Sequence, residues 1–362
     1  MVDDNSNFFH TYHVDELGRL QDVLWVDARS RVAYEEFGDV VVFDSTYLTN
    51  EYKLPFCNFV GVNHHGQTIL FGCALLSRET SETFVWVFSN WLRCMGEKKP
   101  IGILTDQDPA MKKALKLTMK ESTHRWCIWH ITQKFGKKLG KLPNYPALHD
   151  DLENAIYDSL DCEEFESNWQ TVIKKHEIED DEWLTGLFLF IVYVLVSLFC
   201  SVCVLGCVCF VGVSNVEDLL ISTRSTSEKR ADDNNERYVR QAYSDFPAEL
   251  VFQMVYIDAK FKEVQRECSR VMYVSEIHRN KLSDNVTEHI VEDRVWYKPK
   301  NCRKEKPSKM KREYKLLYDS SSKEVSCECR MFDCAGIICR HMIKVYERIN
   351  FFEIPDKYIL RR

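Results

Sequence analysis

The stretch FGDVVVFDSTYLTNEYKLPFCNFVGVNHHGQTILFGCALL, residues 37–76, contains three apolar runs separated by polar segments. Val40–Phe43 is β-branched and apolar, which is typical of a buried strand. Phe56–Val62 and Ile69–Leu76 are two further runs, and the polar turn between them contains a glycine. Three consecutive strands joined in this way predict an antiparallel meander.

Downstream of this stretch, helical and strand patterns alternate. Apolar residues at helical spacing predict helices, and short apolar runs predict strands. In order, we expect a helix over 80–92, a strand at 101–104, a helix over 109–117, a strand at 124–129 and helices over 131–180. Three antiparallel strands followed by alternating helices and strands predict a ribonuclease-H-like α/β fold for residues 1–185.

Two aspartates close predicted strands, Asp44 after the first and Asp106 after the fourth. In a ribonuclease-H-like topology these strand ends lie side by side, so the two carboxylates can share a Mg²⁺ ion. An aspartate at a strand end is more often a turn residue, and both interpretations stay open. Cys127 and His130 have C-x2-H spacing without a second pair nearby, which favours strand-end packing over a secondary metal site.

Residues 186–213 contain no charged residue and are long enough for a transmembrane helix. No basic cluster flanks the segment, so the usual signal for membrane orientation is missing. Its Phe, Val, Leu, Cys and Ser composition is typical of translated uracil-rich, intron-like sequence. We favour that interpretation over a membrane span, and the segment's length argues against a buried core element.

The remaining middle part of the chain is polar and then basic. Residues 217–297 have a mostly helical pattern, and residues 298–315 contain nine Lys or Arg against two Glu. This basic run predicts a solvated linker, with a nuclear-import signal or a phosphate-contacting patch as alternatives. The net charge of the whole chain is −7, so any surface for nucleic acid must be local.

The C-terminal stretch CECRMFDCAGIICRHMIKVYERI, residues 327–349, has the strongest chemical signal in the sequence. Its pattern is C-x-C, nine residues, then C-x-H, and zinc prefers four such soft N and S ligands in a tetrahedron. We expect Cys327 and Cys329 on one side of an extended strand. Cys339 and His341 then come from the turn into a helix, and Gly336 supplies a bend. Cys334 is interpreted as a spectator, with substitution for a neighbouring ligand as the alternative.

The fifteen cysteines do not indicate a disulfide scaffold. Their number is odd, the chain is long, and a basic N-terminal region with an apolar stretch is missing, which predicts no secretory signal. Thiolate ligands in a reducing compartment fit this pattern better. We therefore divide the sequence into a transposase-like domain over 1–185, an apolar insert over 186–216, a helical and basic linker region over 217–313 and a zinc finger over 314–362.

That division rests on a resemblance. The C-x-C…C-x-H pattern resembles the SWIM zinc finger, and FGDVVVFD, ILTDQDPAMKKAL and HRWCIWHI resemble blocks of the Mutator-type transposase domain. The order of these blocks and the finger is similar to that in the plant far-red-impaired-response-related (FRS) family, whose members are transcription regulators derived from such transposases. The resemblance implies a nuclear protein that binds DNA, with protein partners as a further expectation, and acts in light-responsive transcription.

Carried over by motif, Asp44 and Asp106 match the first two acids of a DDE triad, and Cys127 and His130 match the CxxH signature. In family members a separate DNA-recognition domain precedes the blocks found here. The segment expected to carry the third acid falls where the apolar insert stands, and Glu217 and Glu228 have the wrong surroundings. Without a third acid, metal-dependent strand transfer should be largely lost.

Three functions follow from this sequence. The first is a zinc-binding, transposase-derived nuclear regulator that is not an enzyme. The second is a DDE-type transposase, and the third is a membrane-tethered protein that uses residues 186–213. We favour the first.

Overall fold

The computed structural model of the chain describes residues 8–46, 54–157, 159, 162–188, 191, 229–232, 239–244, 246–297, 305–351 and 353–360. The chain forms two compact units, residues 1–228 and 229–362. The predicted apolar insert lies outside the described residues except for residues 186–188 and 191, and so do Glu217 and Glu228.

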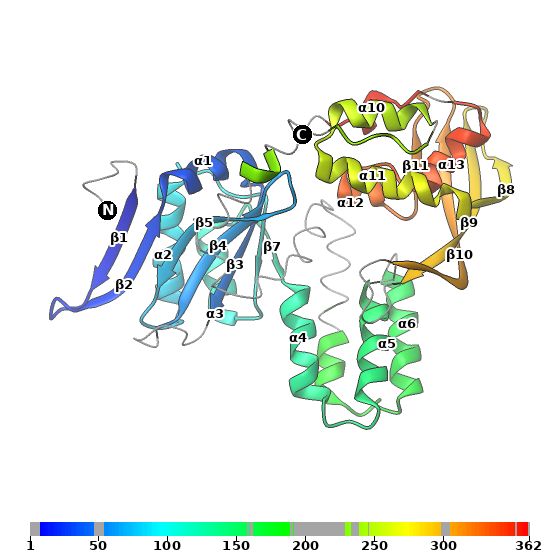
Figure 1. Ribbon diagram of the computed structural model, residues 1–362. Helices are drawn as coiled ribbons and strands as arrows, with labels where there is room; N and C mark the ends of the chain where they lie inside the picture. The colour runs from blue at the N-terminus through cyan, green and yellow to red at the C-terminus, as the bar shows by residue number, and fades with distance from the viewer. Residues whose placement is uncertain are drawn as a thin grey trace. The chain divides into compact units, whose positions relative to one another are not determined.

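The first unit contains a seven-stranded mixed sheet with strand order β1-β2-β5-β4-β3-β6-β7 (Figure 1). Its strands are β1 (Phe9–Val14), β2 (Leu20–Val26), β3 (Val40–Thr46), β4 (Phe56–Val62), β5 (Thr68–Leu75), β6 (Gly102–Thr105) and β7 (Thr123–Trp126). The predicted meander is confirmed, since β4 pairs antiparallel with both β3 and β5. The last two strands, β6 and β7, continue the sheet in parallel with β3.

Both faces of β3 are buried, as its continuous apolar run indicates. Val41 and Phe43 point into a core formed with helices α1 (Ala28–Phe37), α2 (Ser81–Cys94) and α3 (Pro109–Thr118). Val40 and Val42 lie in a smaller apolar cluster on the opposite face of the sheet. Because strand side chains alternate, Asp44 shares the face of Val40 and Val42.

Local sequence signals explain how α2 and α3 begin. The Thr80 hydroxyl accepts a hydrogen bond from the Thr83 amide, and Pro109 occupies the first turn of α3. The Asp108 carboxylate accepts from the Met111 amide at 2.8 Å, which is the capping role that satisfies an otherwise unpaired helix amide.

The first unit differs from the sequence prediction at two places. The predicted strand at 124–129 ends at Trp126, because Cys127 is the N-cap residue of helix α4 (Ile128–Leu139). The hairpin β1–β2 and helix α1 were not predicted. The helical region over 131–180 is confirmed and consists of α4, α5 (Tyr145–Tyr157) and α6 (Cys162–Lys175), which share a separate apolar core.

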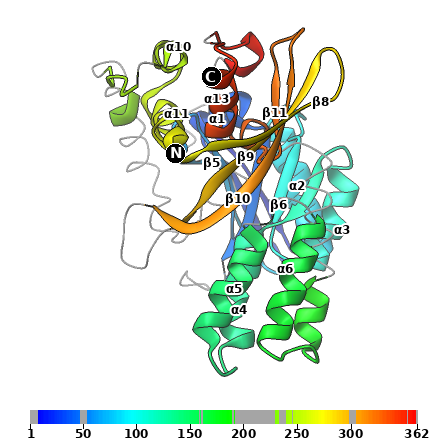
Figure 2. The same cartoon turned by 90° about the vertical axis from the view of Figure 1, so that its right-hand side faces the viewer.

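The second unit contains an antiparallel four-stranded sheet with order β11-β10-β9-β8 (Figure 2). Its strands are β8 (Ser275–Lys281), β9 (Val286–Tyr297), β10 (Lys306–Asp319) and β11 (Val325–Cys327). Its helices are α10 (Pro247–Val255), α11 (Asp258–Arg270), α12 (Met331–Ala335) and α13 (Arg340–Arg348), with short 3-10 turns at Val271–Tyr273 and Asp356–Tyr358. One apolar core joins α10, α11 and α13 to strands β9, β10 and β11.

The second unit corrects two predictions. The mostly helical pattern over 217–297 holds for α10 and α11 but is wrong for 275–297, which form β8 and β9. The basic run is not a linker where it is described, because residues 306–319 form β10 and pair along their length with β9. The predicted boundary between residues 313 and 314 therefore falls inside a strand.

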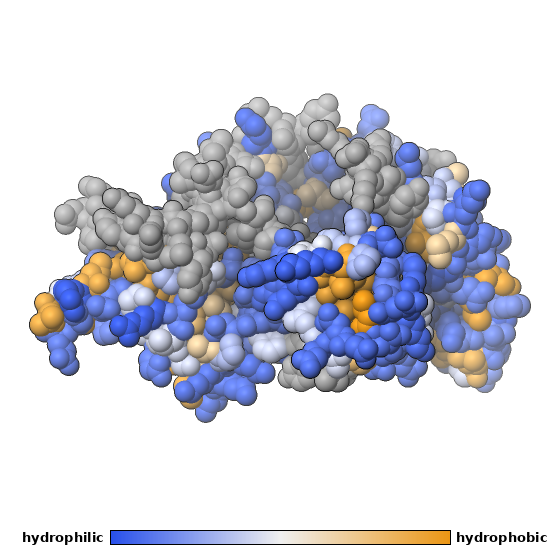
Figure 3. Space-filling model, turned by 90° about the horizontal axis from the view of Figure 1, so that it is seen from below, coloured by the Kyte–Doolittle hydropathy of each residue, from blue (hydrophilic) through white to orange (hydrophobic). Residues whose placement is uncertain are grey.

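In the part of the chain that the structure describes, no helix is long and apolar enough to cross a membrane. On the face of the molecule shown in Figure 3, the described residues are predominantly hydrophilic, and the hydrophobic ones form small separate groups. These observations do not reach most of residues 186–213.

Candidate metal centre

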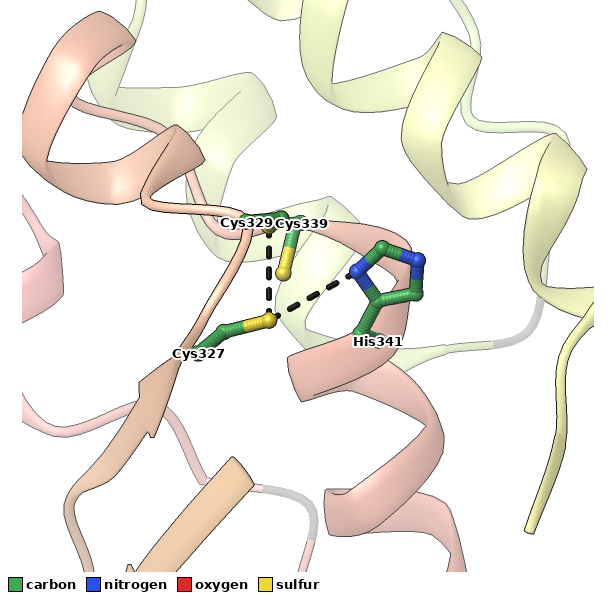
Figure 4. Close-up of side chains that lie close together, drawn as sticks. All are labelled: Cys327, Cys329, Cys339 and His341. Atoms are coloured by element: carbon green, nitrogen blue, oxygen red, sulfur yellow. Dashed lines mark hydrogen bonds between the residues drawn. The ribbon is translucent and has the colours of Figure 1, made fainter. Parts of the chain in front are cut away.

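The four predicted ligands converge in the second unit (Figure 4). Cys327 is the last residue of β11, Cys339 is the N-cap residue of α13, and His341 lies in the first turn of that helix. Cys329 was expected on the same strand as Cys327, but it lies in the turn that follows β11. This turn brings its sulfur back toward Cys327.

Gly336 supplies the predicted bend. It ends α12 with φ +69°, in the left-handed region that a residue without Cβ adopts at little cost. The chain then reverses toward Cys339 and α13. Cys334 lies within α12 and is not one of the four clustered residues, which agrees with its interpretation as a spectator.

The geometry of the four donor atoms fits a tetrahedral zinc ion. The three sulfurs and a ring nitrogen of His341 all lie within 4.8 Å of one another. Cys327 Sγ lies 3.3 Å from Cys329 Sγ and 3.6 Å from His341 Nδ1. Ligands placed about 2.3 Å from a tetrahedral zinc ion lie about 3.8 Å apart. Three thiols and one imidazole are also the donor set that zinc prefers.

The surroundings favour a thiolate at Cys329, whereas burial and the neighbouring thiols raise the pKa values of Cys327 and Cys339. The Cys327 thiol donates a hydrogen bond to Cys329, and hydrogen bonds from Cys327 and Cys339 hold the pKa of Cys329 well below its usual value. The Met342 amide, in the first turn of α13, donates to Cys339 Sγ at 3.4 Å. An amide at a helix N-terminus stabilises negative charge on sulfur.

A carboxylate from outside the predicted finger orients the histidine. Asp293, on β9, accepts a hydrogen bond from His341 Nε2 at 3.2 Å, and both side chains are almost fully buried. The Nδ1 atom of His341 is therefore the one directed at the cysteines. Burial opposes ionisation, but hydrogen bonding to His341 together with the positive charge of Arg340 lowers the pKa of Asp293 below its usual value.

Arg340 links this carboxylate to a second buried acid. Its guanidinium forms ion pairs with Asp293 and with Glu267 on α11, at 3.0 Å in the second case. Glu267 also accepts from the Arg340 backbone amide at 3.1 Å, which caps the start of α13. The network therefore fixes α13, the helix that carries His341, to both α11 and β9.

Tyr314 completes the surroundings of His341. Its ring stacks on the imidazole with a centroid separation of 4.1 Å and an angle of 26° between the ring planes. The sequence analysis did not identify Asp293, Glu267, Arg340 or Tyr314 as site residues. The sequence contains one signal for Asp293, the alternation of residues 291, 293 and 295. Asp293 stands at an inward-facing strand position between the buried Val291 and the partly buried Val295.

In the first unit, the two predicted acids lie on neighbouring strands. Residue Val42 of β3 is paired in parallel with Leu104 of β6, and continuing this register places Asp44 beside Asp106. Each acid meets a cation from α4. His130 Nε2 lies 3.2 Å from Asp44 Oδ1, and Lys134 Nζ lies 2.9 Å from Asp106 Oδ1.

The pKa values of these groups agree with ion pairing. Burial disfavours charged His130, but its hydrogen bond to Asp44 raises the pKa of His130 to about 10. Burial also disfavours ionised Asp106, but the hydrogen bond from Lys134 lowers its pKa below the usual value. Among the described residues, no metal-sized cluster includes Asp44, Asp106, Cys127 or His130.

Comparison with known proteins agrees with this arrangement of a sheet domain and a Cys3His finger. Residues 40–134 match the MULE transposase domain, and residues 316–350 match the SWIM zinc finger. The chain thus contains a region similar to the MULE transposase domain and a SWIM-type finger, and its relatives define the resemblance more closely.

The chain is 29% identical to Protein FAR1-RELATED SEQUENCE 5 of Arabidopsis thaliana, over 99% of this chain and 46% of that protein. It is 29% identical to Protein FAR-RED IMPAIRED RESPONSE 1 of the same organism, over 99% of this chain and 44% of that protein. The chain spans a little under half the length of these relatives. The chain is thus similar over nearly its whole length to members of the FAR1-related sequence family.

Proposed function

We propose that this chain is a zinc-binding nuclear protein that contacts DNA and regulates transcription without catalysing transposition. The light-response role is inferred from the name of the relative FAR-RED IMPAIRED RESPONSE 1. Residues 1–185 serve in this proposal as a transposase-like domain of ribonuclease-H-like fold, for which the meander β3–β5 followed by parallel β6 and β7 is the supporting observation.

The zinc part of the proposal rests on the Cys3His donor set. Cys327, Cys329, Cys339 and His341 hold the ion, and zinc supplies cross-links between β11 and α13. Elemental analysis of the purified chain should give one zinc per chain. A Cys327→Ser variant that keeps full zinc affinity would refute this ligand set.

The non-enzymatic part rests on one observation, the pairing of Asp44 with His130 and of Asp106 with Lys134. Both carboxylates that would coordinate catalytic Mg²⁺ already have cationic partners, and metal binding would have to displace them. We expect no Mg²⁺-dependent strand transfer by the full chain on DNA ends. Strand transfer that is lost in an Asp106→Asn variant would instead establish the alternative, a DDE-type transposase.

DNA contact and regulation are tested separately. A fusion of the full chain to a reporter should localise to the nucleus, and the chain should retard duplex DNA in a binding assay. Chromatin association that changes with far-red illumination would support the light-response role. If the chain neither enters the nucleus nor binds duplex DNA, the regulatory proposal is wrong, whatever the result for zinc.

A further inference from the structure

A groove in the first unit shares no lining residue with the Asp44–Asp106 pair. Helix α3 and strand β7 border this groove of about 380 Å³. Strand β7 is at the edge of the sheet, as Figure 1 shows, so the groove opens where no further strand covers it. The described residues that line it are Lys112, Leu115, Lys116, Met119, Lys120, Ser122, Thr123, His124, Arg125 and Trp126.

The charge of this lining has one sign. Lys112 and Lys116 are four residues apart on α3, which places them on one side of the helix, and Lys120 follows in the turn after the C-cap residue Met119. Arg125 adds a further cation from β7, and none of the described lining residues is acidic.

In the part of the chain that the structure describes, none of the three lysines forms an ion pair. Glu121, the nearest acid in sequence, pairs with Lys99, and the charge of Lys120 acts on it more weakly. Lys112 lies over the Trp126 ring at 4.9 Å, a contact that orients the ammonium group without removing its charge. Lys116 and Lys120 are exposed.

The cations of the groove also act on His124. Burial, followed by the charges of Lys112, Arg125 and Lys116, lowers the pKa of His124 to about 4. The chain as a whole carries a net charge of −7, so this concentration of positive charge belongs to the groove and is not a general property of the surface.

We propose that the α3–β7 groove binds the phosphate backbone of duplex DNA through Lys112, Lys116 and Lys120. The inference rests on the proposed function in that DNA is the ligand, and it adds a contact surface separate from the finger.

An extended polyanion fits this surface better than a single bound anion. Lys116 and Lys120 are exposed, so a lone phosphate there would keep most of its hydration and gain little. A polyanion instead gains from several modest contacts and from the counterions that it releases. Contacts between lysine ammonium groups and phosphates carry no direct sequence information, so we expect binding that is independent of sequence.

The test compares the salt dependence of DNA binding by the full-length chain and by two triple variants. The groove variant carries Lys112→Gln, Lys116→Gln and Lys120→Gln. The control carries Lys137→Gln, Lys138→Gln and Lys141→Gln, which removes the same charge from exposed positions in and just after α4. The probe is a short duplex of arbitrary sequence, and thermal melting of each variant verifies that it is folded.

Loss of three phosphate contacts should make the slope of log K against log salt shallower by about 2.7. The unmodified chain should bind DNA more tightly than the groove variant, and the ratio of their binding constants should therefore fall by about 40-fold between 50 and 200 mM salt. Loss of one phosphate contact changes the slope by about 0.9, and the control variant should change it by less than that.

Different results overturn different claims. If the chain binds DNA and the groove variant has an unchanged slope, the groove inference is wrong while the proposed function stands. If the Cys327→Ser variant and the groove variant both bind DNA as the unmodified chain does, neither the finger nor the groove contributes to DNA binding. If the unmodified chain binds an acidic peptide through the same lysines but not DNA, the partner is a protein, and both the inference and its DNA ligand are wrong.

Discussion

His341 Nε2 and Asp293 Oδ2 lie 3.2 Å apart although 48 residues separate them in the sequence. A histidine that ligates a metal usually donates its other ring N–H to such an acceptor, which fixes the tautomer and the orientation of the ring. The match to the SWIM zinc finger covers residues 316–350 and so includes His341 but not Asp293. The unit that would position the metal is therefore larger than the motif that identifies it.

Asp293→Asn should weaken zinc binding by about 10- to 100-fold. The amide keeps the shape of the side chain but removes the charge that holds the Nε2 proton, and its nitrogen end cannot accept. The measurement is a competition titration of the full chain against a zinc chelator. Substitution of cobalt for zinc gives a second reading, because the absorption of the Co²⁺ site should shift when the imidazole loses its orientation.

Glu292→Gln is the matched control for this change. Glu292 is the neighbouring residue on β9 and pairs with Lys311, a partly exposed ion pair that contributes little to stability. It should leave zinc affinity unchanged. Equal losses in both variants would mean that β9 acts through general stability and not through Asp293.

The ligands and their supporting network differ in how far the sequence predicts them. Cys327, Cys329, Cys339 and His341 are close in sequence, so their spacing is itself a chemical signal. Asp293 reaches His341 only because β9 pairs with β10, and that pairing depends on long-range contacts that spacing does not encode. Residue type alone could not select it from the other acids in the chain.

Long-range pairing also explains where the predicted and the observed secondary structure differ. Val40–Phe43 is apolar on both faces and was predicted correctly as a strand. Strand β10 instead carries exposed lysines over most of its length, and only its last part, around Leu316 and Tyr318, alternates into the core. A charged strand on a solvent-exposed sheet has the composition of a linker, so its pairing with β9 decides its structure.

Zinc removal should loosen the finger without unfolding the first unit. The ion would tie β11 to α13, and α13 packs in the same core as α10 and α11. Hydrogen exchange of the full chain with and without chelator should show faster exchange in residues 325–349, spreading into α11 through Glu267. Amides of β3 and β4 serve as the internal control, and their exchange should not change. Uniform acceleration in both units would contradict this expectation.

The Asp44–His130 pair predicts a pH-dependent stability. Because the folded pKa of His130 is about 10, above the usual 6.5, the stabilisation is complete below about pH 6.5 and is lost as pH rises through about 10. Asp44→Asn should cost about 3 kcal/mol of unfolding free energy at pH 6.5, since it removes the carboxylate that stabilises the charged form of the buried His130. The cost should shrink steadily toward pH 10.

Urea unfolding of the full chain over this pH range, followed for the first unit, gives that free energy. NMR titration of His130 gives its pKa directly, and in Asp44→Asn the value should fall to 6.5 or below. Asp39→Asn, at the exposed entry to β3, is the control and should show no such pH dependence. A constant difference between Asp44→Asn and the unmodified chain from pH 6.5 to 10 would exclude the ion pair as the cause.

Arg340 supports the last prediction, because it is the only described cation that forms ion pairs with both buried acids of the network, Asp293 and Glu267. Arg340→Gln should destabilise the second unit by about 3–5 kcal/mol, since it removes the guanidinium from the buried Glu267 and leaves Asp293 with His341 as its remaining partner. Arg340→Lys should recover only part of this, because one ammonium group lacks the planar fork that spans two partners.

A double-mutant cycle separates the charge effect from lost packing. Glu267→Gln removes one of the two buried charges, so adding it to Arg340→Gln should cost less than it costs in the unmodified chain, with a coupling of about 1–3 kcal/mol. The free energies come from urea unfolding of the zinc-loaded chain. If the two substitutions are additive, Arg340 stabilises α13 through packing alone, and the ion-pair network is not what holds His341 in place.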